Sequence, residues 1–437
     1  MNDINLIYHL YPLRMCYKDD GNKYPLADFV KLIDYWKELS VDFILLAPVF
    51  LSSSHGYDTI DYYQIDPRLG NNESFSQLIK SLHKAGIKVI LDGVFNHVSR
   101  DFFAFQDILQ NRESSKYKDW FYINFSQNNS YQDYFSYQCW EGHQELVKLN
   151  LQNHEVKCYL FDAVKYWITE FGIDGLRLDV AYTLDEIFIR ELNTICKNIN
   201  PDFWLLGEMI HGNYNKLIEH NGVDSVTNYE TYKGLYSSHN DHNYFEIAHT
   251  LKRCFAKNGI YENLSLYNFV DNHDVDRVCS KVIIEEHLFL LYLLLFCIPG
   301  IPSIYYGSES KICGRKEPSS DNELRPFLTP QQIINLSKEN ELAQFIKELA
   351  SIRKNNSILK HGSYQEVYVS SEQYIFLRVL HDQKVIIAVN MSAVSKSVCI
   401  NSLNLNGVYM DLINPLAQVE IPHGTLNLAA YSGMILV

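Results

Sequence analysis

The stretch Gly175-Leu176-Arg177-Leu178-Asp179 decides the fold, because an apolar run of β type ends in a basic and an acidic side chain. Three other apolar runs are also followed by acidic side chains, at Asp92-Gly93-Val94-Phe95-Asn96-His97, Gly207-Glu208 and Phe269-Val270-Asp271-Asn272-His273-Asp274. In an α/β barrel the C-terminal ends of the strands converge on one mouth, where chemistry takes place. We therefore expect one cleft to hold six of these side chains: Asp179, Glu208, Asp274, Arg177, His97 and His273.

The alternation of elements supports a barrel. Short β runs are expected at Leu6–Leu10, Phe43–Leu46, Lys88–Leu91, Gly175–Leu178, Phe203–Leu206, Ser225–Thr227, Leu266–Val270 and Ser303–Tyr306. Amphipathic helices are expected between and after them, at Leu26–Leu39, Ser74–Ala85, Val156–Phe171, Leu184–Asn198, Phe245–Lys257, Glu285–Phe296 and Glu341–Lys354. This pattern predicts an α/β fold, a (β/α)₈ TIM barrel rather than an open sheet.

Two segments break the alternation. Residues 99–150 are rich in Tyr, Phe, Asn and Gln, and a structureless loop of that length is unusual, so we expect an inserted subdomain after strand three. Residues 361–437 are expected to contain short alternating strands, which predict a C-terminal antiparallel β domain. These strands are expected at Gln373–Leu380, Lys384–Asn390, Ser397–Ile400, Gly407–Leu412, Gln418–Ile421 and Met434–Val437. The catalytic barrel is then expected over residues 1–98 and 151–360, with a β-sandwich at the C-terminus.

Composition excludes several functions. The chain has 437 residues, more than one core usually supports, and its net charge of −14 argues against nucleic acid and anionic membranes as partners. Residues 1–15 show no signal-peptide pattern, and the longest apolar run, Leu288–Ile298, is too short to span a bilayer. The nine cysteines are odd in number, widely spaced and without a CxxC pair, which favours reduced thiols and a cytoplasmic location.

Three further motifs complete a recognisable series: His55-Gly56-Tyr57-Asp58-Thr59, Lys148-Leu149-Asn150 and Gly300-Ile301-Pro302-Ser303-Ile304-Tyr305-Tyr306-Gly307. Together with the four stretches above, they stand in the order found in glycoside hydrolase family 13, the α-amylase family, which the chain resembles over its whole length. The closest likeness is to the branch of neopullulanases and cyclomaltodextrinases. Paired carboxylates in a cleft are what cleavage of a glycosidic bond requires.

The resemblance implies roles for the matching residues. It implies that Asp179 is the nucleophile, Glu208 the general acid/base and Asp274 the third carboxylate, which orients the sugar. Arg177 lies two residues before Asp179, on the same face of an extended strand, and is expected to keep the nucleophile ionised. Asp92 is expected to support the site without taking part in the chemistry. The resemblance also implies a set of substrate-binding residues: Tyr57, Asp58, His97, Arg177, His273, Asp321 and Arg325.

The chain departs from starch-degrading members at several positions. Tyr182 and Thr183 stand where those enzymes carry Lys-His, and Asn150 stands where calcium-dependent members carry Asp. Carboxylates strengthen calcium binding, so we expect no required cofactor and no metal among the site residues, with calcium at Asn96 left open as an alternative. The chain also begins almost directly at strand one, so we do not expect the N-terminal domain and the dimer of the neopullulanase branch.

Two other features have open interpretations. His211 is either a substrate contact beyond the cleaved bond or a surface histidine. The polar and aromatic stretch Asn228–Tyr244 is expected to line the acceptor side as a loop, with Lys233 either a substrate contact or solvated.

The resulting hypothesis is a cytoplasmic, retaining glycosidase that cleaves α-1,4-glucosidic bonds of maltooligosaccharides through a covalent glycosyl-enzyme, with an α-glucan oligosaccharide as its partner. A 4-α-glucanotransferase or a trehalose-forming isomerase remains an alternative, because only the acceptor differs. A non-catalytic sugar-binding protein is the third alternative, and the intact Asp179, Glu208 and Asp274 argue against it. Chain-length preference, α-1,6 tolerance and oligomeric state stay open.

Overall fold

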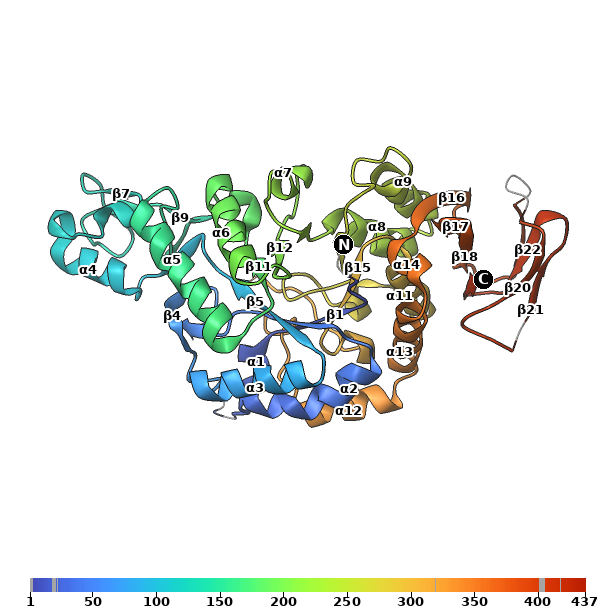
Figure 1. Ribbon diagram of the computed structural model, residues 1–437, viewed down its shortest axis with the longest axis horizontal. Coiled ribbons are helices and arrows are strands. Elements are labelled where there is room, and N and C mark those ends of the chain that lie inside the picture. The colour runs from blue at the N-terminus through green and yellow to red at the C-terminus, as the bar shows by residue number, and fades with distance from the viewer. Residues whose placement is uncertain (1–2, 18–20, 22, 319, 401–404, 417) are drawn as a thin grey trace.

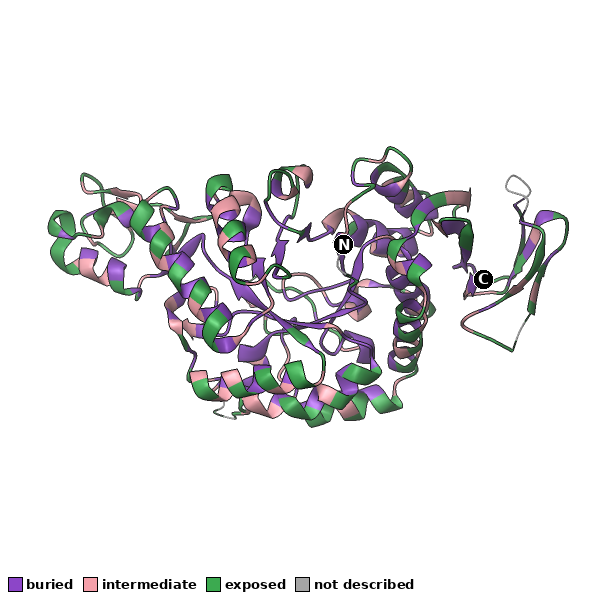
Figure 2. Cartoon of the chain, in the orientation of Figure 1, coloured by how far each residue is buried: buried purple, intermediate pink, exposed green. Residues whose placement is uncertain are grey.

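A computed structural model describes residues 3–17, 21, 23–318, 320–400, 405–416 and 418–437. The barrel lies in the middle of the molecule; the segment with α4 (Phe103–Asn111) lies at one end of the long axis and the C-terminal sheets lie at the other (Figure 1). Burial follows this arrangement, since the barrel strands are buried and the outer faces of the helices are exposed (Figure 2).

The eight-stranded parallel sheet confirms the predicted barrel. Its strands, in hydrogen-bonding order, are β13 (Ser225–Val226), β12 (Trp204–Gly207), β11 (Gly175–Leu178), β5 (Lys88–Gly93), β2 (Phe43–Leu46), β1 (Ile7–Leu10), β15 (Ile301–Tyr305) and β14 (Tyr267–Asn268). A single parallel bridge between Thr227 and Tyr267 joins the two ends of this order and nearly closes the barrel. Each of the eight strands expected from the sequence overlaps one of these strands.

The barrel interior is a packed core. Alternate residues of the strands point inward, and the inner cluster contains Ile7, Phe43, Leu45, Ile90, Trp204, Leu206, Tyr267, Phe269 and Ile301. Gly175 permits the close approach of β11 and β12, because a Cβ atom there would lie 2.5 Å from the carbonyl oxygen of Trp204. A second, larger cluster fills the space between the strands and the surrounding helices.

The expected helices are present, with changes at their ends. They are α3 (Asn72–Lys84), α5 (His154–Tyr166), α6 (Glu186–Ile199), α9 (Tyr244–Phe255), α11 (Glu286–Cys297) and α13 (Glu341–Lys354). The first expected helix is divided into a 3₁₀ segment, η1 (Leu26–Leu32), and α2 (Ile33–Glu38). The expected extension of α5 is a π-helical turn, Trp167–Phe171, which ends at Gly172 with φ of 79°, a conformation that suits glycine. Shorter helices complete the set: α1 (Pro12–Cys16), α7 (Asn215–Ile218), α10 (Val278–Lys281), α12 (Pro330–Glu339) and α14 (Ser357–His361).

The prediction of a loop at Asn228–Tyr244 is wrong, because most of this stretch is helix α8 (Tyr229–Asn240). Its composition is poor for a helix, but its small residues allow close packing on α9: a Cβ at Gly234 would lie 3.0 Å from Cδ1 of Ile247. The side chain of Asn228 caps the helix by accepting a hydrogen bond from the Thr231 amide. Tertiary packing therefore overrides weak local propensity here.

The segment between β5 and α5 contains its own small sheets. Strands β6 (His97–Ser99), β10 (His143–Lys148) and β9 (Cys139–Trp140) form one sheet, and β7 (Ile123–Asn124) pairs with β8 (Ser136–Tyr137). Aromatic side chains of α4 and these strands pack against one another, with Phe105 in contact with Phe121, Phe135 and Tyr137. A further antiparallel pair, β3 (Phe50–Ser52) and β4 (Thr59–Ile65), follows β2.

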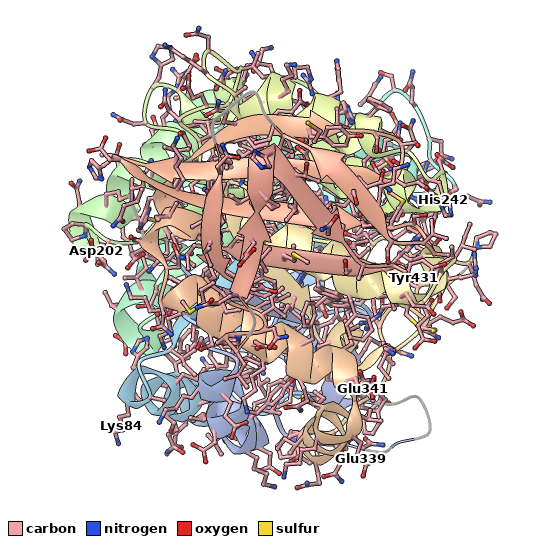
Figure 3. The ribbon with its side chains drawn as sticks, turned by 90° about the vertical axis from the view of Figure 1, so that its right-hand side faces the viewer. Lys84, Asp202, His242, Glu339, Glu341 and Tyr431 are labelled. Atoms are coloured by element: carbon pink, nitrogen blue, oxygen red, sulfur yellow. The ribbon has the colours of Figure 1, made fainter. Side chains whose placement is uncertain are left out.

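The C-terminal part is antiparallel, as predicted. It has a four-stranded sheet of β16 (Ser363–Val369), β17 (Gln373–Leu380), β18 (Gln383–Asn390) and β23 (Ser432–Leu436), with two strand pairs, β19 (Lys396–Cys399) with β22 (Thr425–Leu428) and β20 (Gly407–Met410) with β21 (Gln418–Ile421). Strands β16 and β22 were not predicted from the sequence. Figure 3 looks onto this end of the molecule, where His242 and Tyr431 both contact His287 of α11.

Within the described ranges, no helix is long and apolar enough to cross a membrane. The most apolar helix, α11, has 12 residues and is buried between the barrel and the C-terminal sheet, in contact with β15 and β23.

Candidate active site

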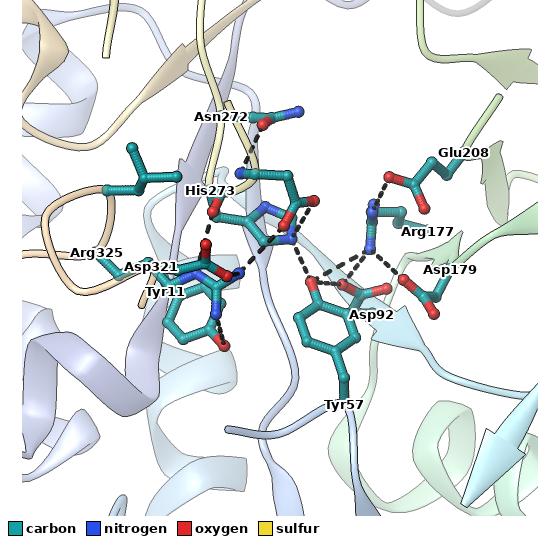
Figure 4. A network of polar contacts seen from close by, with 12 residues as sticks. Tyr11, Tyr57, Asp92, Arg177, Asp179, Glu208, Asn272, His273, Asp321 and Arg325 are labelled. Carbon is teal, nitrogen blue, oxygen red and sulfur yellow. Dashed lines mark hydrogen bonds and ion pairs between the residues drawn. The ribbon is translucent and has the colours of Figure 1, made fainter. Parts of the chain in front are cut away.

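Arg177 at the end of β11 joins three carboxylates that come from three different strand ends (Figure 4). Its Nη1 donates to Asp92 Oδ2 at 2.5 Å and lies 3.4 Å from Asp179 Oδ1. Its Nη2 lies 2.6 Å from Glu208 Oε1. These distances follow from the parallel register, in which Arg177 pairs with Asp92 on β5 and with Leu206 on β12, two residues before Glu208.

Arg177, Asp92, Asp179 and Glu208 form a cluster with one cation and three acids, and all four side chains are almost completely buried. Burial, together with the nearby Glu208 charge, raises the pKa of Asp179 well above its usual value, and Arg177 only partly opposes the shift. Burial also raises the pKa of Asp92 to about 6, against the lowering effect of Arg177. Arg177 thus acts on Asp179 in the predicted direction, but one guanidinium does not offset desolvation and the second carboxylate, so the net shift of the Asp179 pKa is upward.

The backbone after Asp179 is arranged around Glu208. Val180 has φ of 42°, in the left-handed region that a β-branched residue rarely occupies. In this conformation its amide N–H donates to Glu208 Oε2 at 2.8 Å. Both carboxylate oxygens of Glu208 thus have a donor, one from Arg177 and one from the main chain. Strained backbone at a polar cluster of this kind is typical of a functional site.

Tyr57 and His273 form the next part of the network. Their rings are stacked at 5.6 Å with an interplanar angle of 4°, and the Tyr57 hydroxyl lies 2.5 Å from His273 Nε2. The same hydroxyl lies 3.0 Å from Asp92 Oδ2. Burial lowers the pKa of His273 well below its usual value, so this imidazole is neutral near neutral pH.

Asp274 and Arg325 come from two neighbouring loops and meet beside His273. Arg325 Nη2 lies 3.1 Å from Asp274 Oδ1 and 2.8 Å from Asp321 Oδ2. Arg325 Nε donates to the His273 carbonyl at 3.0 Å, and its Nη1 donates to the Tyr11 hydroxyl at 3.1 Å. The Asp274 side chain keeps 35% of its exposure, whereas the Asp179 side chain keeps 8%. Among Asp179, Glu208 and Asp274, the Asp274 carboxylate is therefore the most open to a ligand.

His97 begins β6 and contacts the segment between β5 and α5. Its ring is stacked 6.0 Å from Trp140 of β9, and its Nδ1 contacts the Asn96 side chain at 3.1 Å. Its Nε2 is buried without a hydrogen-bond partner. Burial lowers the pKa of His97 to about 4. A neutral imidazole with a free ring nitrogen is able to bind a hydroxyl group.

Other predicted residues lie outside this network. The Asp58 carboxylate is occupied by its own loop, accepting from the backbone amides of His55 and Gly56 and from the Ser54 hydroxyl. His211 is exposed, with its ring 5.2 Å from that of Tyr182. Lys233 is exposed on α8 and lies 4.0 Å from Glu246 of α9.

The amides considered for calcium have protein partners. Asn96 Oδ1 accepts from the Thr183 hydroxyl at 3.3 Å, and the Asn150 side chain donates to the Asp119 carbonyl at 3.1 Å and accepts from the Gln152 amide at 3.2 Å. Among the described residues, no group of three or more His, Cys, Asp or Glu side chains is arranged to hold a metal ion. These amides alone supply too little charge for a strong calcium site.

Three residues of the site were not found from the sequence: Tyr11, Trp140 and Tyr229. Tyr11 directly follows β1, so the rule that strand ends face the cleft would have found it. The Tyr229 hydroxyl accepts from Asn272 at 3.1 Å, and Trp140 reaches His97 only through the fold of the insertion. No sequence signal distinguishes Trp140 from the other aromatic residues of that segment.

Comparison with known proteins agrees with this geometry. The family described as the alpha amylase catalytic domain matches residues 10–335. The chain is 32% identical over 432 residues to a cyclomaltodextrinase of Thermoanaerobacter pseudethanolicus, with coverage of 91% of this chain and 72% of that protein. It is also 32% identical over 467 residues to neopullulanase 2 of Thermoactinomyces vulgaris, covering 99% of this chain and 77% of that protein.

A solved structure resembles the fold over nearly its full length. The debranching enzyme of Nostoc punctiforme, soaked with acarbose, has a TM-score of 0.84 and 28% sequence identity, and the match covers 99% of this chain and 97% of that one. The barrel, the insertion and the C-terminal sheets therefore occur together, in the same order, in a known protein.

Proposed function

We propose that this chain, which belongs to the alpha-amylase family, hydrolyses α-1,4-glucosidic bonds of maltooligosaccharides and retains the anomeric configuration. One observation carries the proposal: Arg177 gathers Asp179, Glu208 and Asp92 in a buried cluster, with Asp274 open to the cleft beside it. Two carboxylates of this kind suit a displacement at a sugar carbon in two steps.

In the proposed first step, Asp179 attacks the anomeric carbon while Glu208 gives a proton to the leaving glycosidic oxygen. A covalent bond forms between Asp179 and the sugar, and the shortened glucan leaves. In the second step, Glu208 takes a proton from water, and the resulting hydroxide displaces Asp179. Retention requires the two carboxyl groups to lie about 5–5.5 Å apart, and this separation is part of the proposal.

The first step also requires a particular distribution of charge: a negative charge on Asp179 and a proton on Glu208. Burial and the Glu208 charge raise the pKa of Asp179, and Arg177 opposes this shift. Arg177 contacts both groups and stabilises whichever is charged.

The residues around the cluster are proposed to hold the sugar. Asp274 and the neutral His273 offer an acceptor and a ring nitrogen, and Asp321 with Arg325 lies next to them. His97 and Trp140 form the opposite wall, so we propose that residues 99–150 act as a subdomain that shapes the cleft, between the barrel portions 1–98 and 151–360 and apart from the β domain at 361–437. Asp58 is proposed to contribute to sugar binding indirectly, because its carboxylate fixes the shape of the Ser54–Gly56 turn.

Product analysis with defined substrates tests the proposal. Wild type and Asp179→Asn are incubated with maltotriose through maltoheptaose and with β-cyclodextrin, and the products are resolved over time. We expect glucose and maltose from wild type, and a loss of about 10³-fold or more for the variant. Chains longer than the substrate would instead support a glucanotransferase, and trehalose would support an isomerase.

Cleavage of α-1,6 bonds is a second candidate, favoured by one observation. The debranching enzyme of Nostoc punctiforme matches the chain over 99% of its length, including the insertion that borders the cleft. Pullulan contains both linkages, so its products separate the two activities. Panose from pullulan would indicate α-1,4 cleavage, whereas maltotriose would indicate α-1,6 cleavage.

We also propose a cytoplasmic location. All nine cysteines are free, including the exposed Cys158, Cys313 and Cys399, and free thiols persist in a reducing compartment. Fractionation of the native host, with the protein detected by antibody, tests this proposal.

A further inference from the structure

Two free cysteines meet at the rim of the barrel, on the side where the strands end. Cys279 belongs to α10, a few residues after Asp274, and Cys313 follows the short 3₁₀ turn η6 (Ser308–Ser310) after β15. Their Sγ atoms are 2.7 Å apart, closer than two sulfur atoms approach in ordinary van der Waals contact. The two residues therefore need little movement to become covalently linked.

The two thiols differ in their accessibility. Cys313 is exposed, whereas Cys279 is partly buried. Burial and the neighbouring Cys313 thiol raise the pKa of Cys279 to about 12. A small oxidant in solution therefore reaches Cys313 first, and Cys279 is placed behind it as the second thiol.

The cysteines lie on two segments that are already joined by hydrogen bonds. The Arg277 amide donates to the Gly314 carbonyl at 3.0 Å, and the Gly314 amide donates to Ser280 Oγ at 2.8 Å. The Lys316 amide donates to Asp276 Oδ1 at 2.7 Å. We call these segments, residues 274–281 and 311–316, the rim strap.

The rim strap ends at the candidate active site. Lys316 Nζ lies 3.2 Å from the Asp274 carbonyl, and the Asp274 side chain contacts Arg325, which follows the second segment. The positions of Asp274 and Arg325, which lie on two different loops, therefore depend on the alignment of this strap. A covalent link at its outer end would hold the two loops in register.

We propose that Cys279 and Cys313 form a reversible disulfide that locks the rim strap, with a small disulfide such as oxidised glutathione as the oxidant. The Cys313 thiolate attacks one sulfur of glutathione disulfide, the S–S bond breaks, and one glutathione thiolate leaves. The Cys279 thiolate then attacks the Cys313 sulfur of the mixed disulfide, and the second glutathione leaves. Two protein thiols are oxidised, one small disulfide is reduced to two thiols, and the two cysteine protons go to the departing thiolates.

The disulfide closes a loop of about 35 residues that contains α11 and β15, and it restricts the unfolded chain and the opening of the strap. Since the sulfurs already touch, the link leaves the positions of Asp274 and Arg325 unchanged. The oxidised protein is therefore expected to resist heat better while its folded structure stays the same. This inference does not depend on which glycosidic bond the protein cleaves.

The test uses the full chain equilibrated in reduced or in oxidised glutathione, followed by alkylation and peptide mapping. We expect oxidation to remove two alkylatable thiols and to give one peptide pair linked through Cys279 and Cys313. Circular dichroism should show a Tm about 3–5 °C higher for the oxidised form, and dithiothreitol should reverse the change. Cys313→Ser should abolish both effects, and Cys158→Ser, a change at another exposed thiol, should leave both intact.

Two results would overturn the proposal. One is that Cys313 ends as a mixed disulfide with glutathione and no linked peptide forms, which would mean that Cys279 cannot reach it. The other is that the linked peptide forms but the Tm of the two forms is equal, which would mean that the bond does not hold the strap. Because the readouts are peptide masses and unfolding, they stay interpretable even if the proposed hydrolysis fails.

Discussion

Arg177 Nη2 lies 2.6 Å from Glu208 Oε1, so the guanidinium of β11 is bound directly to the carboxylate that follows β12. The other terminal nitrogen of the same side chain contacts Asp92 and Asp179. One cation thus connects every acid of the buried cluster, and the cluster's charge depends on it.

Replacement of Arg177 by lysine tests this dependence. A lysine ammonium is a single point of charge and cannot bridge carboxylates on both sides as the planar guanidinium does. We expect kcat/KM on maltotriose to fall by about 10³-fold and the Tm to drop, since a buried carboxylate loses its partner. Arg190→Lys, in an exposed pair with Glu186, is the matched control and should change neither quantity. Activity within tenfold of wild type would contradict the role of Arg177.

Tyr57→Phe removes one oxygen and leaves the ring stacked on His273. The hydroxyl contacts His273 Nε2 and Asp92 Oδ2, so its loss removes one hydrogen bond from each, while Arg177 Nη1 still donates to Asp92 Oδ2 and Asp274 Oδ2 still lies 3.1 Å from His273 Nε2. We expect a loss of stability of about 1 kcal/mol and a decrease in kcat/KM of about 10–100-fold. Thermal unfolding and steady-state kinetics measure the two effects. If only stability changed, Tyr57 would support the fold without contributing to the reaction.

Asp321→Asn should affect binding more than chemistry. Asp321 lies 2.8 Å from Arg325 and is partly exposed, and Figure 4 shows this pair on the opposite side of Tyr57 from Asp179. The neutral amide weakens the ion pair and the contact to a sugar hydroxyl, so we expect KM to rise about tenfold with kcat within about threefold of wild type. Kinetics on maltotriose over a full substrate range give both values. An equal loss in kcat would place Asp321 in the reaction itself.

The packing of α8 against α9 should respond to acid through His239. Its Nδ1 donates to the Leu235 carbonyl, its Nε2 accepts from the Tyr244 hydroxyl, and burial lowers its pKa to about 3. At a pH between about 3 and the ordinary histidine pKa of about 6.5, His239 binds a proton in the unfolded chain but not in the folded chain. The free energy of unfolding therefore falls as the pH drops through this window, by about 2 kcal/mol from this residue at a pH near 5.

Urea unfolding of wild type and His239→Gln near pH 7 and near pH 5 measures this effect. We expect the variant to be less stable than wild type near pH 7 and to lose less stability on acidification. His287 packs against His239 and contributes in the same direction, since burial lowers its pKa as well. An identical pH response of the two proteins would show that His239 is not the titrating group.

Much of the fold could be predicted because the signals are local. Most of the barrel strands are short apolar runs, four of which lead into acidic residues, and α6 and α13 have the periodicity of amphipathic helices. Helix α8 was missed because its stability comes from packing against α9, which the polar composition of its sequence does not reveal. Strand β22 was missed for a similar reason, since its partner β19 lies 26 or more residues away in the chain.

The proximity of several expected residues could be predicted, but the charge of their cluster could not. The order of motifs brought Asp179, Glu208 and Arg177 to adjacent strand ends, and the register places them in contact. The direction of the Asp179 pKa shift depends on how deeply the cluster is buried and on the Glu208 distance, which no pattern of residues specifies. Trp140 contacts His97 only through the fold of the segment between β5 and α5, which its sequence does not reveal, whereas Tyr11 directly follows β1 and could have been found.

The most direct test of the central claim is proton NMR of the anomeric signals during cleavage of maltotriose by the wild-type protein. Double displacement through Asp179 predicts that the first product appears as the α-anomer and only later equilibrates with the β-anomer. Asp179→Asn, recorded in parallel, should give no product on the same time scale. Initial formation of the β-anomer, or undiminished cleavage by the variant, would contradict the account.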